Sequence, residues 1–119
     1  IKLEDLSYAK DNSGKTLVTF HGQFFNQQDL VIEYQGRSSA LSALNKAVNA
    51  QMPTITVIDY NSRSKGVTVD ATCASTIFID YNGKRFNAEA EDDDIEISAL
   101  KAFIAAVNMA YVEEHFKLN

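Results

Sequence analysis

The sequence predicts an α+β fold of two βββα units with pseudo-two-fold symmetry, helices packed on antiparallel sheet. Three observations predict it: turn signals separate strand-like runs, two later segments change to the helical period, and those two segments align with each other. The repeat units are expected at about residues 1–51 and 52–119. We expect the whole chain, 1–119, to form a single domain.

Two hairpin turns organise the strand-rich parts. "DNSG" (residues 11–14) separates "LEDLSYAK" from "KTLVTF", and "YNG" (81–83) separates "STIFID" from "KRFNAEA". Asn-Gly between β-branched and aromatic residues is the strongest short-range hairpin signal. A further strand, in "PTITVIDY", is expected after Pro53. Alternating apolar residues predict two shared strand faces, one with Leu30, Ile32 and Tyr34 and the other with Ile77, Ile79 and Tyr81.

The two helical segments also match each other in sequence. "LSALNKAV" (41–48) lies over "ISALKAFI" (97–104) at a constant offset, with Ser-Ala-Leu in common. Ser38 or Ser39 is expected to cap the first helix, and Asp93 or Asp94 the second. Apolar residues at spacings of three and four define the buried faces: Leu41, Leu44 and Val48, then Ile97, Leu100, Ile104, Val107 and Tyr111. A stripe of alanines on the second helix permits close backbone approach, to the sheet or to another subunit: Ala99, Ala102, Ala106 and Ala110.

Composition disfavours several classes of partner. The formal net charge is −5 without a basic cluster, which disfavours nucleic acid. No apolar run reaches the roughly 18 residues of a membrane span, so no membrane partner is expected. The one cysteine, Cys73, excludes an intramolecular disulfide and is compatible with the cytoplasm, where we expect the protein. We predict that Cys73 is a small, buried strand residue.

No catalytic or metal site is predicted. His21 and His115 lack metal-ligand spacing, and no phosphate loop or nucleophile motif is present. The run of acids from Glu89 to Glu96 lacks the spacing of a calcium loop. It is expected to be a solvated hairpin end that leads into the second helix, whose first turn favours acids.

The loop "YQGRSSALSAL" (34–44) leaves two alternatives open. Backbone N–H groups and hydroxyls at a helix start can hold a carboxylate or another small anion. The same residues also form an ordinary strand-to-helix connection with serine caps. Taken alone, the residues favour the ordinary connection.

An ordered set of short motifs runs through the second half of the chain. They are "VIDY" (57–60), "GVTVDA" (66–71), "NGKRF" (82–86), Asp94-Ile95, Ser98 and "AAVN" ending at Asn108. In this order they resemble the C-terminal regulatory domain of 2-isopropylmalate synthase, which related citramalate synthases share. That family is also built of two βββα units, so the resemblance covers essentially the whole chain.

The resemblance implies a domain without chemistry of its own. In that family the domain forms a homodimer and binds an end product near the dimer interface: leucine or, in citramalate synthases, isoleucine. Binding inhibits a separate TIM barrel, which condenses acetyl-CoA with a 2-oxo acid using a divalent metal and is absent from these residues. We therefore expect this chain to be a single regulatory domain with no catalytic activity and no cofactor.

The resemblance also implies an effector site. Its apolar lining falls on Leu41, Val57, Ala71 and Ile95, and its polar contacts on Ser38, Ser39, Asp59 and Tyr60, with Arg37 and Ser64 beside them. Each of these residues alone also fits core packing or capping.

The sequence departs from the family where glycines are usual. "RSSA" (37–40) replaces a glycine-rich loop, and Ala88-Glu89-Ala90 replaces a later Gly-x-Gly. The alternatives are a structural dimerisation module that has lost its effector site, or the regulatory domain of a citramalate or homocitrate synthase.

Overall fold

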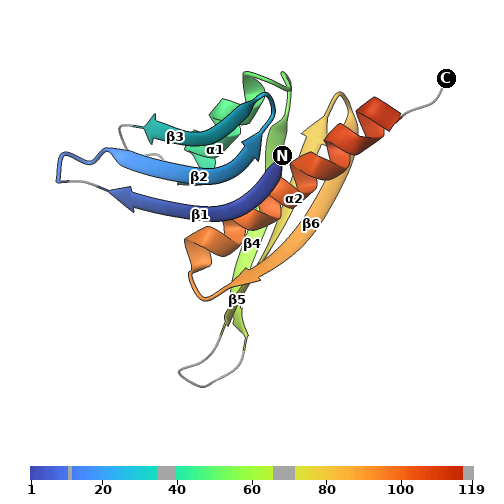
Figure 1. Ribbon diagram of the computed structural model, residues 1–119. Coiled ribbons are helices and arrows are strands. Elements are labelled where there is room, and N and C mark those ends of the chain that lie inside the picture. Colours follow the sequence, from blue (N-terminus) through green and yellow to red (C-terminus); the bar gives the residue numbers. More distant parts are fainter. Residues whose placement is uncertain (11, 35–39, 66–71, 117–119) are drawn as a thin grey trace. The chain divides into compact units, whose positions relative to one another are not determined.

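The chain folds into two compact units, Ile1–Pro53 and Thr54–Asn119. The structure, a computed structural model, describes residues 1–10, 12–34, 40–65 and 72–116. Each unit has three antiparallel strands followed by a helix (Figure 1). This confirms the predicted α+β fold with two βββα repeats. That the whole chain acts as one regulatory domain stays a prediction.

The first unit is built around the apolar face of its sheet. Its elements are β1 (Lys2–Lys10), β2 (Thr16–Phe24), β3 (Gln27–Tyr34) and α1 (Ala40–Asn49), with the strands in the order β1-β2-β3. Leu30 and Ile32 lie opposite Phe20 and Val18, whose side chains are fully buried, so the predicted strand face exists. α1 packs on β2 and β3. Its predicted apolar residues are buried as expected: Leu41, Leu44 and Val48.

The second unit repeats this order with longer elements. They are β4 (Thr56–Lys65), β5 (Thr72–Tyr81), β6 (Lys84–Asp92) and α2 (Ile95–Phe116), with the strands in the order β4-β5-β6. α2 crosses one face of this sheet and packs mainly on β5 and β6 (Figure 1). The predicted face of Ile77, Ile79 and Tyr81 is the one that α2 covers, because all three side chains are buried.

The Asn-Gly turn joins β5 to β6 as predicted. Asn82 and Gly83 both have positive φ, 55° and 82°, which a type I′ turn requires. The Gly83 N–H donates to Asp80 Oδ1 at 3.2 Å, and Asn82 Oδ1 accepts from Thr54 Oγ1 at 2.8 Å. The turn thus fixes the register of the hairpin and bonds to Thr54, two residues before β4.

The predictions for two groups of polar residues hold only in part. The acids from Glu89 to Asp92 lie at the end of the β5–β6 hairpin and lead into α2 as predicted, but they belong to the regular strand β6, which continues to Asp92. Cys73 lies on β5 as predicted, but it is half-buried because it sits near the strand's start. Its Sγ is 3.9 Å from the Asp93 carbonyl oxygen.

α2 is apolar around much of its circumference. The aliphatic residues Ile97, Leu100, Ile104 and Val107 and the alanine stripe are all buried, with exposed fractions of 5% or less for all four alanines. Ser98, beside that stripe on the helix, bonds Ser75 of β5, and Ala110 lines a hollow with Tyr81 and Phe86. The alanines therefore face the sheet, where their small size lets the helix approach closely.

The apolar character of α2 has a second consequence. Residues Ile95–Glu114 are long and apolar enough to cross a membrane by length and composition, a possibility that a search for uninterrupted apolar runs missed. More than half of this stretch is buried inside the protein, and Lys101 and Glu113 interrupt it. A helix that is apolar nearly all round is also what a buried core position requires.

The predicted cap of α2 is Asp94, whereas the caps proposed for α1, Ser38 and Ser39, lie outside the described residues. Asp94 Oδ1 accepts from the backbone N–H groups of Glu96 at 2.8 Å and Ile97 at 3.2 Å. These N–H groups have no partner within the helix, so the carboxylate satisfies them and meets the positive end of the helix dipole.

Replacing this cap should destabilise the protein. Asp94→Ala leaves both N–H groups without their acceptor, and we expect the free energy of unfolding to fall by about 1 kcal/mol. Urea denaturation measures the change. The neighbouring Asp93→Ala should change it by less than about 0.5 kcal/mol; equal effects of the two variants would contradict the assignment of Asp94 as the cap.

Candidate functional site

Three of the expected effector residues lie on one face of β4. Val57, Tyr60 and Ser64 lie opposite Ile79, Ile77 and Cys73 of β5, and opposed residues in antiparallel strands share a face. That face is the one on which α2 packs. Ser62, opposite Ser75, completes the set. We call these four residues the β4 strip: Val57, Tyr60, Ser62 and Ser64.

The β4 strip is open because α2 lies mainly over β5 and β6. Tyr60 is 55% exposed, although its opposite residue Ile77 is fully buried. Ile95, the first residue of α2, is 48% exposed. An aromatic ring and an aliphatic side chain are thus both accessible to a ligand in the second unit.

Other expected residues are not brought into the β4 strip. A bulge between Val57 and Asp59 shifts the register, so Asp59 lies opposite Phe78 on the other face of the sheet. Leu41 is buried in α1 of the first unit. Arg37, Ser38, Ser39 and Ala71 lie outside the described residues. Effector binding at any of the ten positions stays a prediction.

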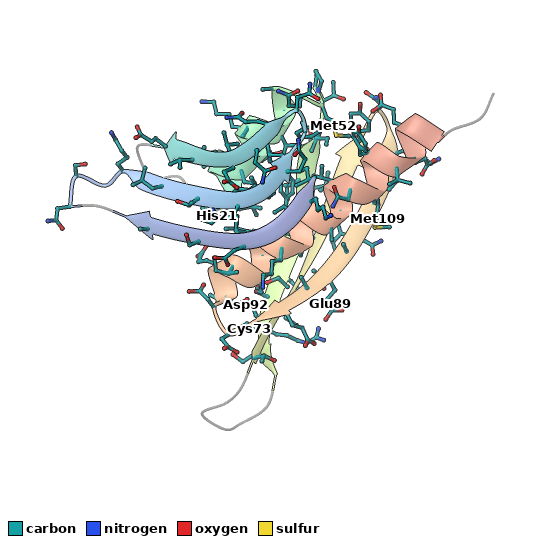
Figure 2. The ribbon with its side chains drawn as sticks, viewed as in Figure 1. His21, Met52, Cys73, Glu89, Asp92 and Met109 are labelled. Atoms are coloured by element: carbon teal, nitrogen blue, oxygen red, sulfur yellow. The ribbon has the colours of Figure 1, made fainter. Side chains whose placement is uncertain are left out.

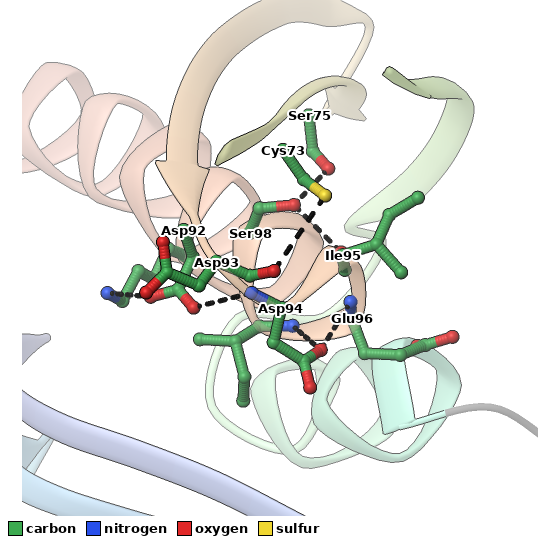
Figure 3. A network of polar contacts seen from close by, with 10 residues as sticks. Cys73, Ser75, Asp92, Asp93, Asp94, Ile95, Glu96 and Ser98 are labelled. Atoms are coloured by element: carbon green, nitrogen blue, oxygen red, sulfur yellow. Dashed lines mark hydrogen bonds and ion pairs between the residues drawn. The ribbon is translucent and has the colours of Figure 1, made fainter. Parts of the chain in front are cut away.

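A chain of serines connects the β4 strip to the start of α2. Ser62 Oγ lies 2.6 Å from Ser75 Oγ, which lies 2.6 Å from Ser98 Oγ. Ser98 Oγ in turn donates to the Ile95 carbonyl oxygen at 2.7 Å (Figure 3). We call Ser62, Ser75 and Ser98 the serine ladder. Ser75 and Ser98 are fully buried, so these bonds satisfy hydroxyls that water does not reach.

The direction of the hydrogen bonds in the serine ladder is fixed by its inner end. A carbonyl oxygen only accepts, so the Ser98 hydroxyl proton is committed to Ile95. Ser75 must then donate to Ser98, and Ser62 must donate to Ser75. The single proton of Ser62 therefore points inward, and toward solvent its oxygen can only accept. A ligand group that meets Ser62 must be a donor, such as an ammonium.

Sequence reasoning missed the serine ladder, although one signal was available. Ser75 alternates with Ile77 and Ile79 along β5, so it belongs to the buried face, where a hydroxyl needs a partner. Ser98 was noted only as part of the Ser-Ala-Leu match. Nothing in the sequence of β4 indicates that Ser62 is the third member.

The start of α2 is not an open anion site. Asp94 already occupies its N–H groups, and the Asp94 N–H itself donates to Asp92 Oδ1 at 3.0 Å (Figure 3). Asp92 Oδ2 accepts from Lys101 Nζ at 2.7 Å. The Lys101 ammonium, with the Asp94 N–H, holds the pKa of Asp92 below its ordinary value of 3.8. This region therefore suits a cation better than a carboxylate.

No metal site is evident in the part of the chain that the structure describes. No three side chains of His, Cys, Asp or Glu are grouped there as ligands. His21 Nδ1 lies 3.9 Å from Asp29 Oδ1 on the first sheet, whereas Cys73 and Asp92 belong to the second sheet (Figure 2). The acids at the start of α2 serve as helix cap and ion-pair partner.

A separate hollow of about 280 Å³ lies at the other end of α2. Tyr81 Oη donates to Glu114 Oε2 at 2.8 Å, and Lys84 pairs with Glu113 at its rim. Burial, with the hydrogen bond to Glu114, raises the pKa of the Tyr81 phenol above its ordinary value. Because its polar side chains bond one another, we assign this hollow no ligand.

Comparison with known families decides the classification. Residues 2–111 match the model of a family described as the LeuA allosteric (dimerisation) domain. The chain belongs to this family. The motifs quoted from the second half, including the β4 segment "VIDY", fall within the matched residues.

Two curated relatives of this LeuA domain are 2-isopropylmalate synthases. The protein of Oceanobacillus iheyensis is 32% identical over 90 residues, which cover 75% of this chain and 18% of the relative. The protein of Pseudoalteromonas atlantica is 27% identical over 115 residues, which cover 92% of this chain and 22% of the relative. The chain thus spans about a fifth of the length of these relatives.

The serine ladder makes a prediction about stability. Ser75→Ala removes the donor to Ser98 and the acceptor of Ser62, so buried polar groups lose their partners. We expect the free energy of unfolding to fall by about 1–3 kcal/mol in urea denaturation. Ser64→Ala, on the exposed end of the same face, should cost less than about 0.5 kcal/mol. A Ser75→Ala protein as stable as the parent would contradict the ladder.

Asp92 makes a prediction about pH. Because folding lowers its pKa, its contribution to stability is present above the unfolded value near 3.8 and is lost as pH falls below it. Asp92→Asn should therefore be less stable than the parent at pH 7, and the difference should close by about pH 2. Urea denaturation at both pH values measures this; a difference between the two proteins that is as large at pH 2 as at pH 7 would contradict the role of the Asp92 carboxylate.

Proposed function

We propose that this LeuA domain is the amino-acid-sensing, dimer-forming regulatory part of a 2-isopropylmalate synthase, and that leucine bound to it inhibits the enzyme. The match of residues 2–111 to a family described as allosteric and dimerising carries this proposal. The condensation, with acetyl-CoA and a divalent metal, would belong to the remainder of a longer protein. This chain then requires neither a catalytic residue nor a cofactor, and it acts in the cytoplasm.

The β4 strip supports binding of a branched aliphatic side chain. Val57, the Tyr60 ring and Ile95 offer apolar surface in one unit, and two of them are about half exposed. Covering such surface with a ligand is favourable by about 25 cal/mol per Å² of apolar area removed from water. A few polar groups beside an apolar lining are typical of small-ligand sites.

Polar groups near the β4 strip favour the amino group of the ligand. The Ser62 oxygen accepts toward solvent, and the start of α2 carries acids. The ligand's carboxylate needs a different partner because Asp94 fills the helix start. The resemblance assigns that role to the loop with Arg37, Ser38 and Ser39, which lies outside the described residues.

One departure from the family does not disfavour sensing. Ala88 and Ala90, which replace family glycines, lie in a regular part of β6 without a positive φ. Glycine's conformational freedom is not needed at these positions. The alternative, a purely structural dimerisation module, is therefore favoured only by the replaced glycines in the loop before α1. Experiment decides between the two functions.

Calorimetric titration of the 119-residue chain with leucine, isoleucine and valine tests the proposal. We expect saturable binding of leucine, weakened at least tenfold by Tyr60→Ala because the ring supplies apolar contact. Asn61→Ala, the next residue but on the opposite face, is the matched control and should bind as the parent does.

A thermal shift gives an independent reading of the same titration. Leucine at about 100 times its dissociation constant should stabilise the folded state by about 2.7 kcal/mol and raise the melting temperature. A folded dimer that gives neither heat nor a thermal shift with any of the three amino acids would refute the sensing function and leave the structural dimerisation module. Preference for isoleucine would indicate a citramalate synthase.

A further inference from the structure

The serine ladder connects the β4 strip to groups that no ligand touches. Ser62 is half-buried at its outer end, and the fully buried Ser75 and Ser98 continue it to the Ile95 carbonyl oxygen (Figure 3). Its links are 2.6 and 2.7 Å long, in the short half of the range for hydroxyl hydrogen bonds. What Ser62 offers to a ligand therefore depends on the interior of the unit.

The common direction of these bonds makes Ser62 a strong acceptor. All three protons point from Ser62 toward Ile95, because the carbonyl oxygen at the inner end only accepts. Hydrogen bonds in such a chain polarise one another, so a hydroxyl that donates becomes a better acceptor. Ser62 is the member of the ladder that donates to a hydroxyl without accepting from one. Its oxygen is thus the acceptor that the ladder presents outward.

Ser62 and Tyr60 are spaced for one small amino acid. They lie opposite Ser75 and Ile77, on the same face of β4, and alternate residues of a strand are about 6.6 Å apart. Ordinary bond lengths place the amino nitrogen of leucine roughly 5 Å from its terminal carbons. A ligand whose apolar end covers the exposed Tyr60 ring therefore has its amino group within reach of Ser62 Oγ.

A 2-oxo acid differs from the corresponding amino acid at the atom that meets Ser62. It keeps the side chain and the carboxylate, but a carbonyl oxygen replaces the ammonium. The ammonium only donates hydrogen bonds and the carbonyl oxygen only accepts them. Because the Ser62 proton is committed inward, the carbonyl finds no donor there, and two acceptors face each other. A polar group that binding leaves without a partner lowers affinity.

We propose that the serine ladder makes the β4 strip select an α-amino acid over the 2-oxo acid with the same side chain, with Ser62 as the specificity-determining residue. Ser75 and Ser98 are positioning residues, because they hold the Ser62 proton inward without contacting the ligand. This inference rests on the proposed sensing function and names the chemical distinction that the sensor makes.

Charge at the start of α2 is the rival explanation. Acids there attract any cation, although Asp94 caps the helix and Asp92 is paired with Lys101. A preference that comes from charge alone does not change when an uncharged serine is replaced. Reversing the direction of the ladder therefore separates the two explanations.

Ser98→Ala is expected to reverse the ladder. Without Ser98 Oγ, the proton of the buried Ser75 has Ser62 Oγ as its remaining partner within the ladder. A buried donor without an acceptor is costly, so Ser75 then donates to Ser62, and the Ser62 proton turns toward the ligand. One missing oxygen atom leaves too little room for a replacing water, whose share of the liquid volume is about 30 Å³.

Calorimetric titration of the 119-residue chain with leucine and with 4-methyl-2-oxopentanoate, the 2-oxo acid with the same side chain, tests the proposal. The selectivity ratio is the dissociation constant of the 2-oxo acid divided by that of leucine. In the parent we expect a ratio of at least about 100, because a site that hydrogen-bonds a donor rejects the analogue that lacks it. In Ser98→Ala the ratio should fall at least about tenfold, mainly because the 2-oxo acid binds more tightly.

Ser62→Ala removes the acceptor itself. Leucine should bind at least about tenfold more weakly, because hydrogen bonds to charged groups are the stronger ones, whereas the 2-oxo acid should not be weakened. A purely structural role of the ladder would weaken both ligands alike. A melting transition shows whether each variant is folded; because Ser62 is half-buried, this variant also serves if Ser98→Ala does not fold.

The 2-hydroxy acid with the same side chain is the control ligand. Its hydroxyl both donates and accepts, so it fits either direction of the ladder, and its dissociation constant should change by less than about threefold in Ser98→Ala. A large loss of affinity for this ligand would indicate a damaged site and contradict a reversed ladder.

Thr76→Val is the matched control variant. Thr76 follows Ser75 on β5 and points to the other face of the sheet, and valine replaces its hydroxyl with a methyl group. The selectivity ratio should stay within about twofold of the parent value, as for a substitution away from the site. A fall as large as that in Ser98→Ala would mean that any disturbance of β5 has this effect, and it would overturn the proposal.

Failure of this inference differs from failure of the sensing function. Saturable leucine binding with the same selectivity ratio in the parent, Ser98→Ala and Ser62→Ala refutes the role of the ladder and leaves the sensor intact. A parent that binds the 2-oxo acid as tightly as leucine does so too. A folded parent that gives no heat with any of the amino acids refutes the sensor, and the selection with it.

Discussion

The close approach of α2 to its sheet is the constraint on which the rest of the second unit depends. The buried alanines set that distance, because along their stripe the helix itself contributes no side chain longer than a methyl group to the contact with β5 and β6. Only at this distance do the hydroxyls of Ser98 and Ser75 come within 2.6 Å. Larger residues in the stripe would lift the helix and break the serine ladder.

The two repeats use the same helix sequence differently. Ser42 and Ser98 occupy equivalent positions in the Ser-Ala-Leu match, yet Ser42 is exposed and Ser98 is fully buried. α1 has 10 residues and α2 has 22. The serine ladder is therefore a property of the second unit and not of the repeat. It connects β4, where effector residues are expected, to the first turn of the longer helix.

Local patterns were sufficient to predict much of the fold. The Asn82-Gly83 turn and the Asp94 cap follow from residue types that favour one backbone conformation, so sequence alone located both. The bulge before Asp59 could not be predicted in this way. It depends on how β4 pairs with β5, and one extra residue moves a side chain to the other face of the sheet.

The candidate site was predictable only in part for the same reason. Family resemblance located Val57, Tyr60 and Ser64, and strand alternation past the bulge explains why they share a face. Ser62 belongs to the serine ladder because of Ser75 and Ser98, which lie 13 and 36 residues further along the chain, and no short-range pattern connects residues so far apart. Contacts of this kind belong to tertiary packing.

The position of α2 after all three strands has a consequence for biosynthesis. Among the described residues of the second unit, α2 is the element that covers the face of Ile77 and Ile79, so that face remains exposed to water until the helix has been made. At roughly 5–20 residues per second, the 22 residues of α2 take about 1–4 s to translate. Until α2 is available, the three strands have no helix to cover their apolar face, so the unit reaches its native state only when α2 packs on the sheet.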